Sequence, residues 1–245
     1  MRTTRRCPRR DGSEVNRGSI AAADEARHPD CAIEAWWWWG AGEVTGIGTV
    51  GLFVGFELRG ARFDYWAGLV RDDEPYLYIE ELNGVGLRGG LEIKPPEMWA
   101  DHVCDVPGQQ WSLGNEAHGV LLDDPTEAWR RAYGTPVPVT FDVEWYASAP
   151  AAPLDGLVAG ADGYRQDGEI DARIELTEGI VHVTGPGERV HVWGTPYLPT
   201  SFAMPTDVRG LRAPYRRYDG TAVDQVLTAA SGRVPRWHVH VDGAR

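Results

Sequence analysis

Most of the chain alternates between apolar and polar positions with a period of two, which is the pattern of β-strands that bury one face. The clearest example is TVGLFVGFEL, residues 49–58, in which one face is entirely apolar. That face consists of Val50, Leu52, Val54, Phe56 and Leu58. The opposite face is mainly glycine, which indicates close approach of a ligand or of another backbone. The segment is therefore predicted to be a half-buried strand.

Similar segments follow at short intervals, separated by Gly, Pro and Asp. They read ARFDYWAGLV, PYLYIEEL, GLEI, QQWSLGNEAHGVLL, VPVTFDVEWYAS, GEIDARIEL, GIVHVTG, ERVHVWG and RWHVHV. Many short strands between turn signals predict an all-β protein, built as a barrel or a sandwich. The 30 glycines and 17 prolines fit a chain with many turns.

One segment, DDPTEAWRRAYG, has the pattern of a helix instead. Asp124 is placed to cap its N-terminus, Pro125 to take the first helical position and Glu127 to complete a capping box. Gly134 marks the end. A short helix is predicted over about residues 124–133.

Composition divides the chain into three parts. Residues 1–31 are polar and of mixed charge, without the apolar segment of a secretory signal, and are predicted to be a disordered leader or the product of an over-extended start codon. Residues 147–163, ASAPAAPLDGLVAGADG, are rich in Ala, Pro and Gly and indicate a linker. We therefore expect an N-terminal lobe over 32–155 and a C-terminal lobe over 156–245.

The segment GERVHVWG raises the question of a site. In an extended strand Arg189, His191 and Trp193 share one face, and Val190 and Val192 share the other. A valine face packs readily into a core. The row of Arg, His and Trp must face either solvent or a lined cavity, and we expect it at a pocket or at a lobe interface.

Carboxylates and aromatic residues also occur together on other strands. The run of four tryptophans in EAWWWWG is either a fully buried strand or one that lines an apolar cavity. FDVEWYAS and FDYW place Glu144 and Asp64 next to aromatic residues, and NEAHGV puts Glu116 and His118 on one face. A polar outer face explains such residues on most strands. Inside a hydrophobic barrel, burial would instead raise the pKa of a carboxyl group and keep it protonated as a proton donor.

Charge and cysteine content restrict the partners. The net charge of −12 argues against a nucleic-acid partner, which needs clustered cations. No apolar run reaches the roughly 18 residues of a membrane-spanning helix, so stable membrane insertion is not expected. Three cysteines without a CxxC spacing argue against a disulfide framework and predict a cytoplasmic protein.

Cofactor motifs are missing from the sequence. GAGEVTGIG lies between strand-like segments and does not precede a helix, and neither GxSxG nor HExxH occurs. His238 and His240 share a strand face, as a metal pair or as part of a solvated edge, and we favour the edge. We therefore expect no cofactor and no metal. The oligomeric state stays open.

Two parts of the chain resemble a known superfamily. GYRQDGEIDARIEL and TGPGERVHVWG are similar to the second half of the carotenoid 1,2-hydratase-like and lipocalin-like Diels–Alderase superfamily. LEIKPPEMWADHVCDVPGQQWSLGNEAHGVLLDDP resembles the first half of its actinobacterial members. Together the resemblance spans most of residues 33–240. It implies two lipocalin-like antiparallel lobes with a hydrophobic pocket in or between them. Because 245 residues are few for two complete barrels, one lobe would be open or trimmed.

The most specific part of the resemblance is a motif approximating RDHxWG. Arg189, His191, Trp193 and Gly194 match it, but Val190 occupies the acidic position. If the family's Asp donates a proton or orients the histidine, this chain lacks that role. The departure argues against hydration by that route and favours a shape-driven cyclisation or another carboxylate in its place.

Together these observations predict a cofactor-independent cyclase acting on a hydrophobic terpenoid or polyketide. It would be a pericyclase, or an acid-type cyclase, hydratase or isomerase. The alternative is a lipocalin-like binder or carrier of an apolar small molecule, without turnover. The predicted catalytic residues are His191, Glu116, Glu144 and Asp64. The predicted substrate-binding residues are Trp37, Trp39, Tyr65, Trp66, Trp111, His118, Trp145, Tyr164, Gln166, Arg189 and Trp193.

Overall fold

The computed structural model describes residues 20, 22–128, 131–154 and 161–194, and the strands at 211–216, 222–230 and 236–242. Two short helical segments are present in this part, α1 (Ala22–Glu25) and the 3-10 turn η1 (Pro125–Glu127). The strands are β1 (Ile33–Val44), β2 (Gly48–Arg59), β3 (Arg62–Arg71), β4 (Leu77–Val85), β5 (Met98–Val106), β6 (Gln110–Leu122), β7 (Gly134–Ala147), β8 (Ala152–Pro153), β9 (Ala161–Leu176), β10 (Gly179–Gly194), β11 (Leu211–Arg216), β12 (Ala222–Ala230) and β13 (Arg236–Asp242).

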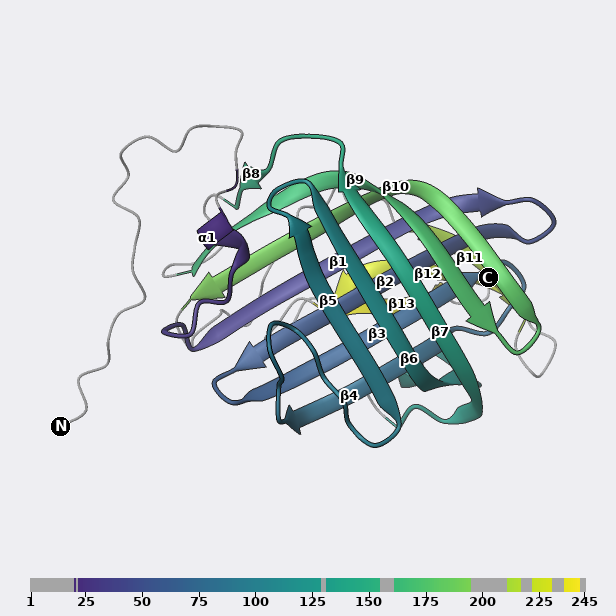
Figure 1. Cartoon of the computed structure of the whole chain (residues 1–245). Helices are drawn as coiled ribbons and strands as arrows, with labels where there is room; N and C mark the ends of the chain where they lie inside the picture. Colours follow the sequence, from purple (N-terminus) through teal and green to yellow (C-terminus); the bar gives the residue numbers. More distant parts are fainter. Residues whose placement is uncertain are drawn as a thin grey trace.

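The strands from β1 to β10 form one antiparallel sheet that closes on itself. Its order is β10-β1-β2-β3-β4-β6-β7-β9, and β9 pairs in turn with β10. β5 pairs with β6 alongside this ring, and β8 pairs with the start of β9. In Figure 1 the strands β5, β6 and β7 cross in front of β1 to β4, so that the two walls enclose the core between them. The predicted all-β, barrel-like fold is confirmed.

Two hydrophobic clusters lie on the two faces of this sheet. The larger fills the barrel and includes Trp36, Trp38 and Phe56. The smaller lies on the outer face of β1, β2, β3 and β10 and includes Trp37 and Val190. The second sheet, β11-β12-β13, lies against β2 and β3. Because both faces of β1 are buried, its tryptophans can follow one another without a polar residue between them.

The apolar face of residues 49–58 lies inside the barrel, as its alternation predicts. The glycine face lies against side chains of the protein. Gly55 on β2 is paired with Trp66 on β3, and a Cβ at Gly55 would overlap the indole ring of Trp66. This glycine is therefore explained by packing within the sheet.

Replacing Gly55 with alanine is expected to destabilise the protein by about 1–3 kcal/mol, because Trp66 is fully buried and cannot move aside without straining its neighbours. Urea unfolding followed by far-UV circular dichroism measures the change. Gly89→Ala is the matched control, since no atom lies within 4 Å of a Cβ there. Equal stability of the two variants would contradict the packing explanation.

Of the helix predicted over residues 124–133, the described residues form the 3-10 turn η1, where the N–H of Glu127 donates to the carbonyl of Asp124. Ala132 then takes a positive φ of 48°, and its N–H donates back to the carbonyl of Glu127. The chain then enters β7 at Gly134. Residues 129 and 130 lie outside the described residues.

The predicted lobe boundary at 155/156 lies within residues 155–160, outside the described residues. Strands from both sides of it, such as β7 and β9, pair in the same sheet. The side chains of His238 and His240 also lie outside the described residues.

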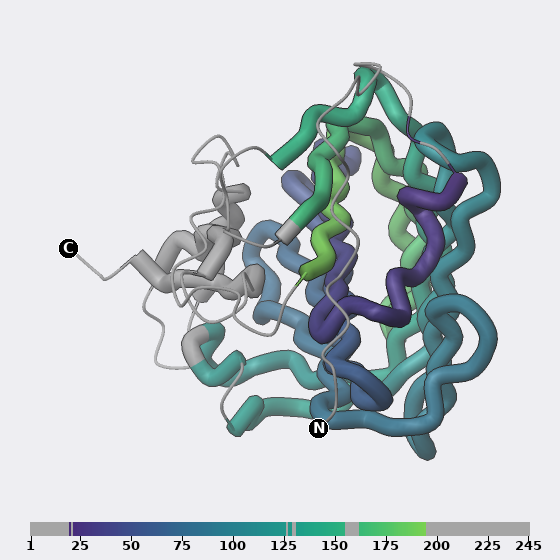
Figure 2. Tube along the Cα trace, turned by 90° about the vertical axis from the view of Figure 1, so that its left-hand side faces the viewer, coloured from purple at the N-terminus to yellow at the C-terminus, as the bar shows by residue number. Residues whose placement is uncertain are grey.

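The predicted disorder of the leader does not extend to residues 22–31. These residues form α1 and the chain that leads into β1, and Glu25 is buried. Figure 2 shows this purple segment lying across one end of the ring of strands. Residues 1–19 and 21 lie outside the described residues.

Cysteine chemistry also differs from the expectation. Cys31 is disulfide-bonded and Cys104 is a free thiol, so the argument for a reducing compartment no longer holds. In the described part of the chain, no helix is long and apolar enough to cross a membrane.

Candidate functional site

Buried polar side chains gather at the end of the barrel that the segment 22–32 covers. We call them the barrel-end network: Glu25, Glu34, Tyr164, Gln166, Arg189 and His191. Strand register explains how they meet. On β9 and β10, Tyr164 pairs with His191 and Gln166 with Arg189, so all four project into the barrel. Glu34 comes from the start of β1 and Glu25 from α1.

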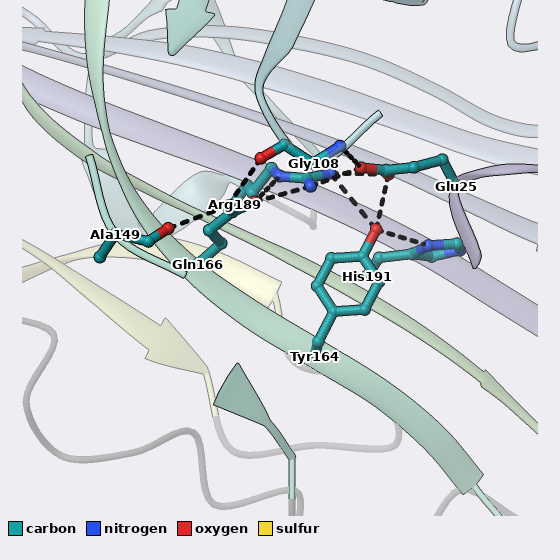
Figure 3. A network of polar contacts seen from close by, with 7 residues as sticks. All are labelled: Glu25, Gly108, Ala149, Tyr164, Gln166, Arg189 and His191. Atoms are coloured by element: carbon teal, nitrogen blue, oxygen red, sulfur yellow. Dashed lines mark hydrogen bonds and ion pairs between the residues drawn. The ribbon is translucent and has the colours of Figure 1, made fainter. Parts of the chain in front are cut away.

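The centre of the network is an ion pair between Arg189 and Glu25 (Figure 3). The guanidinium donates to both carboxylate oxygens, with Nη2 to Oε1 at 2.6 Å and Nη1 to Oε2 at 2.8 Å. It also lies over the ring of Trp145, 4.9 Å from its centroid. Only 1 % of Arg189 is exposed. A bidentate pair of this kind is stronger and more directional than a single contact.

Gln166 connects this pair to two neighbouring turns of the chain. Its Oε1 accepts from Nε and Nη2 of Arg189 at 3.0 and 2.7 Å. Its Nε2 donates to the carbonyls of Gly108 and Ala149. The N–H of Gly108 donates to Glu25 at 2.7 Å. These bonds hold α1, the β5–β6 turn and the segment that follows β7 in one arrangement (Figure 3).

A second carboxylate, Glu34, lies between two imidazoles. Its Oε1 accepts from Nδ1 of His28 at 2.7 Å and from Nε2 of His191 at 2.9 Å. Its Oε2 accepts from the backbone N–H of His28 at 2.8 Å. The rings are held by aromatic contacts: His28 stacks on Trp193 at 4.0 Å, and His191 stacks on Trp36 at 4.5 Å.

Tyr164 joins the two halves of the network. Its hydroxyl lies 2.6 Å from Oε2 of Glu25 and 3.3 Å from Nδ1 of His191, and it accepts from Nη1 of Arg189 at 3.3 Å. One hydroxyl proton therefore faces two acceptors, and the shorter distance favours Glu25. The oxygen can still accept a bond from a protonated His191.

Burial and pairing compete at the Arg189 pair. Burial by itself would raise the pKa of Glu25, but the hydrogen bonds and charge of Arg189, with bonds from Tyr164 and Gly108, hold that pKa below its ordinary value. Burial would lower the pKa of Arg189, yet Glu25 and Tyr164 raise it. Both groups are therefore ionised at neutral pH.

The same competition has a different result at His191. Burial lowers the pKa of this imidazole, and the contact with Glu34 only partly opposes it, so the ring is neutral near pH 7. Burial also raises the pKa of Tyr164, which keeps the hydroxyl protonated. The pKa of Glu34 is lowered, because bonds from His191 and His28 outweigh the opposing effect of burial.

Stability should consequently fall in acid through Glu25. Since its folded-state pKa lies below the ordinary value of 4.5, its contribution is complete above pH 4.5 and is lost as the pH falls further through the folded-state pKa. Urea unfolding between pH 7 and pH 3 measures this. Glu25→Gln should show a weaker dependence on pH below 4.5. Identical slopes in the two proteins would exclude Glu25 as a source of the acid sensitivity.

Several of the residues predicted from sequence are brought together here. Arg189, His191 and Trp193 share the inner face, and Val190 and Val192 lie in the outer cluster. The other predicted residues at this site are Tyr164, Gln166, Trp111 and Trp145.

Other predicted residues lie elsewhere. Glu144 is on the outer side and accepts from Gln110 and Ser112, while Asp64 accepts from the N–H of Asn83. Their strands direct odd and even positions to opposite faces, and these positions are the outer ones. Glu116 and His118 are exposed and line a separate cavity of about 540 Å³. Trp37, Trp39 and Trp66 face outward, and Tyr65 lies deeper in the barrel.

Glu25, His28 and Glu34 are functional candidates that sequence reasoning missed. Glu34 had a signal, because it shares a strand face with Trp36 and Trp38 and is thus a carboxylate on an otherwise apolar face. Glu25 and His28 lie in the polar leader and have no local pattern. Glu25 and Glu34, the two carboxylates near His191, therefore come from the N-terminal part of the chain. The site contains acidic groups although Val190 occupies the acidic position of the motif.

A cavity of about 280 Å³ opens beside this network, and we call it the His28 cavity. It is lined by Arg27, His28, Pro29, Cys31, Glu34, Leu58, Gly60 and Ala61. Its size is close to the lower limit of small-molecule sites, which begin at about 300 Å³. His28, Glu34 and His191 also form a set of possible metal ligands, whose ligand atoms all lie within 4.8 Å of one another.

Comparison with known proteins gives little further identification. No protein-family model matches the chain, and no curated protein matches it. A solved structure of a candidate AttH protein from Nitrosomonas europaea is similar over 96% of this chain and 75% of its own, at 13% identity and a TM-score of 0.49. The superfamily suggested by the sequence motifs therefore stays a prediction.

Proposed function

We propose that this protein is a non-redox enzyme of the cyclase, isomerase or hydratase type, acting on an apolar small molecule by proton transfer at the barrel end. The observation that carries the proposal is the chain of hydrogen bonds from His28 through Glu34 to His191, whose Nδ1 faces the hydroxyl of Tyr164 at 3.3 Å. Its outer end borders the His28 cavity.

The hydrogen-bonded chain keeps its contacts when His191 gains a proton. Neutral His191 donates from Nε2 to Glu34 and presents Nδ1 to Tyr164. After gaining a proton, it would donate from Nδ1 to the same hydroxyl, which keeps its own proton on the bond to Glu25. These contacts hold His191, and through it Glu34, in place in either protonation state of the imidazole.

Contact with the His28 cavity distinguishes the candidate catalytic residues from the residue that positions them. His28 and Glu34 line the cavity, so they are the candidate catalytic groups. His191 is fully buried and acts through Glu34 as a positioning residue. Pro29, Leu58 and Ala61 give the cavity an apolar wall suited to a hydrocarbon group.

The substrate can be sought without knowing it in advance. Untargeted metabolite profiles are compared between the producing strain and a deletion strain, and the deletion is complemented with wild type, Glu34→Gln or His182→Ala. His182 is an exposed histidine on β10 and is the matched control. Wild type and His182→Ala should restore the profile.

The strain complemented with Glu34→Gln should convert the substrate about 10²–10⁴-fold more slowly than the strain complemented with wild type, because that is the usual contribution of general acid–base catalysis. A thermal melt confirms that the variant is folded. A deletion strain with unchanged metabolites, or full restoration by folded Glu34→Gln, would rule the proposal out.

A carrier of apolar molecules is the second candidate, supported by a different part of the barrel. His102 is 3 % exposed, and within the described part of the chain neither of its ring nitrogens has a hydrogen-bond partner. It lies against Tyr65, whose hydroxyl accepts from Asn115, while Oδ1 of Asn115 is also without a partner there. Burial lowers the pKa of His102 to about 3, so its ring is neutral.

Such a group could bond to the polar end of a ligand. For a carrier, His102→Phe should weaken binding of a fluorescent fatty acid, while Glu34→Gln should not affect it. Unchanged binding in His102→Phe would count against this candidate.

A further inference from the structure

We propose that His28, Glu34 and His191 bind one divalent transition-metal ion, with the His28 cavity providing access to its open coordination position. The inference rests on the proposed function only in its location: the same three side chains form the hydrogen-bonded chain, and a bound ion would take the place of the hydrogen bonds between them. It goes beyond that function by assigning them a ligand of their own. Nδ1 of His28, Oε1 of Glu34 and Nε2 of His191 are the ligand atoms.

The ligand set has the chemistry of a catalytic zinc site. Two imidazole nitrogens and one carboxylate oxygen, with a fourth position left open, suit Zn²⁺ or a similar first-row ion, whereas Ca²⁺ and Mg²⁺ prefer oxygen ligands. Zinc bonds of about 2.0–2.2 Å at tetrahedral angles separate the ligand atoms by roughly 3.3–3.5 Å. The imidazole nitrogens lie 2.7 and 2.9 Å from Oε1, so each would move back by about half an ångström.

Charge balance gives an independent argument. Arg189 is committed to Glu25 by two hydrogen bonds, so it compensates that carboxylate. Glu34 is 3 % exposed, and the groups that bond to it are two imidazoles and a backbone N–H. A cation between Glu34 and the imidazoles would place a positive charge against this buried carboxylate, as Arg189 does for Glu25.

The surrounding bonds also hold the ligands in the required tautomers. With Nε2 of His191 on a metal, its Nδ1–H donates to the hydroxyl of Tyr164, which in turn donates to Glu25. Oε2 of Glu34 accepts from the backbone N–H of His28, leaving Oε1 for the metal. Metal-bound histidines and carboxylates commonly have such partners, which fix their orientation.

The full-length protein, stripped with a chelator and dialysed, is titrated with Co²⁺ and read by visible absorption, and Zn²⁺ content is measured by elemental analysis. Wild type should bind one ion per chain. Loss of a hydrogen bond to a metal ligand weakens metal affinity by roughly 10–100-fold, and Tyr164→Phe should fall within that range. His28→Ala and Glu34→Gln remove a ligand itself and should weaken Co²⁺ binding by a larger factor. His28 is partly exposed, so His28→Ala tests the site even if Glu34→Gln fails to fold.

Two controls test whether the site is specific. His182→Ala and the double variant His238→Ala/His240→Ala should bind Co²⁺ as wild type does. Absence of stoichiometric metal in wild type, unchanged binding in His28→Ala, or loss of binding only in the double variant would overturn the metal site. These readings need no substrate, so a failed metal site leaves the enzyme proposal standing. Unchanged metabolites in the deletion strain would overturn the enzyme proposal and leave the metal site standing.

Discussion

Replacing Arg189 with methionine is expected to destabilise the protein by about 3–5 kcal/mol, the usual cost of removing one partner from a buried ion pair. The change would leave the carboxylate of Glu25 buried among Tyr164, Gly108 and the barrel wall without its compensating charge. It would also remove both donors from Oε1 of Gln166. Urea unfolding at pH 7, followed by far-UV circular dichroism, gives the change in unfolding free energy.

A double variant separates the pair from the packing around it. Glu25→Met combined with Arg189→Met removes both charges, so no unpaired ion stays buried. We expect it to lose clearly less stability than the sum of the two single variants, as for residues in direct contact. Additive losses would mean that the contact between these side chains does not stabilise the end of the barrel.

Replacing Trp36 with alanine is expected to cost a similar amount, about 3–5 kcal/mol, because truncation of a buried tryptophan leaves a cavity in the core. Trp36 is 1 % exposed, stacks on His191 and meets Phe56 edge to face. Its loss also removes the ring that packs against His191, one of the proposed metal ligands. The unfolding free energy in urea measures the first effect, and Co²⁺ affinity of the folded variant measures the second.

Two further variants control this experiment. Trp36→Phe keeps an aromatic ring against His191 and should recover part of the loss. Tyr146→Ala removes an aromatic side chain that is 45 % exposed on β7, and it should change stability by no more than about 0.5 kcal/mol. A Trp36→Ala protein as stable as Tyr146→Ala would contradict the placement of Trp36 in the core.

The outcome for each predicted residue depended on which face of its strand points inward. Alternation correctly placed Arg189, His191 and Trp193 on one face, but the same rule could not tell that Glu144 and Asp64 point outward. A shift by one residue reverses the faces of a whole strand, and only pairing with neighbouring strands removes that ambiguity. The run of tryptophans added a second difficulty, because both faces of β1 are buried.

The carboxylates of the site illustrate the limit of local pattern. Glu25 and Glu34 meet Arg189 and His191 across 164 and 157 positions of sequence, respectively. Glu25 and His28 are ordinary polar residues in a polar segment, and nothing in their neighbours distinguishes them from a solvated leader. Their burial follows from the segment 22–32 lying across the end of the barrel (Figure 2).

By itself, the sequence determined that this protein is built of antiparallel strands and that Arg189, His191 and Trp193 share a face. Period-two alternation is a local property, and backbone geometry converts it directly into two faces. Tertiary structure alone decided that β10 pairs with β1 and β9 to close the ring, and that Glu25, His28 and Glu34 supply the acids and the second imidazole. Those contacts arise from strand pairing and chain packing over long sequence distances, which local alternation does not record.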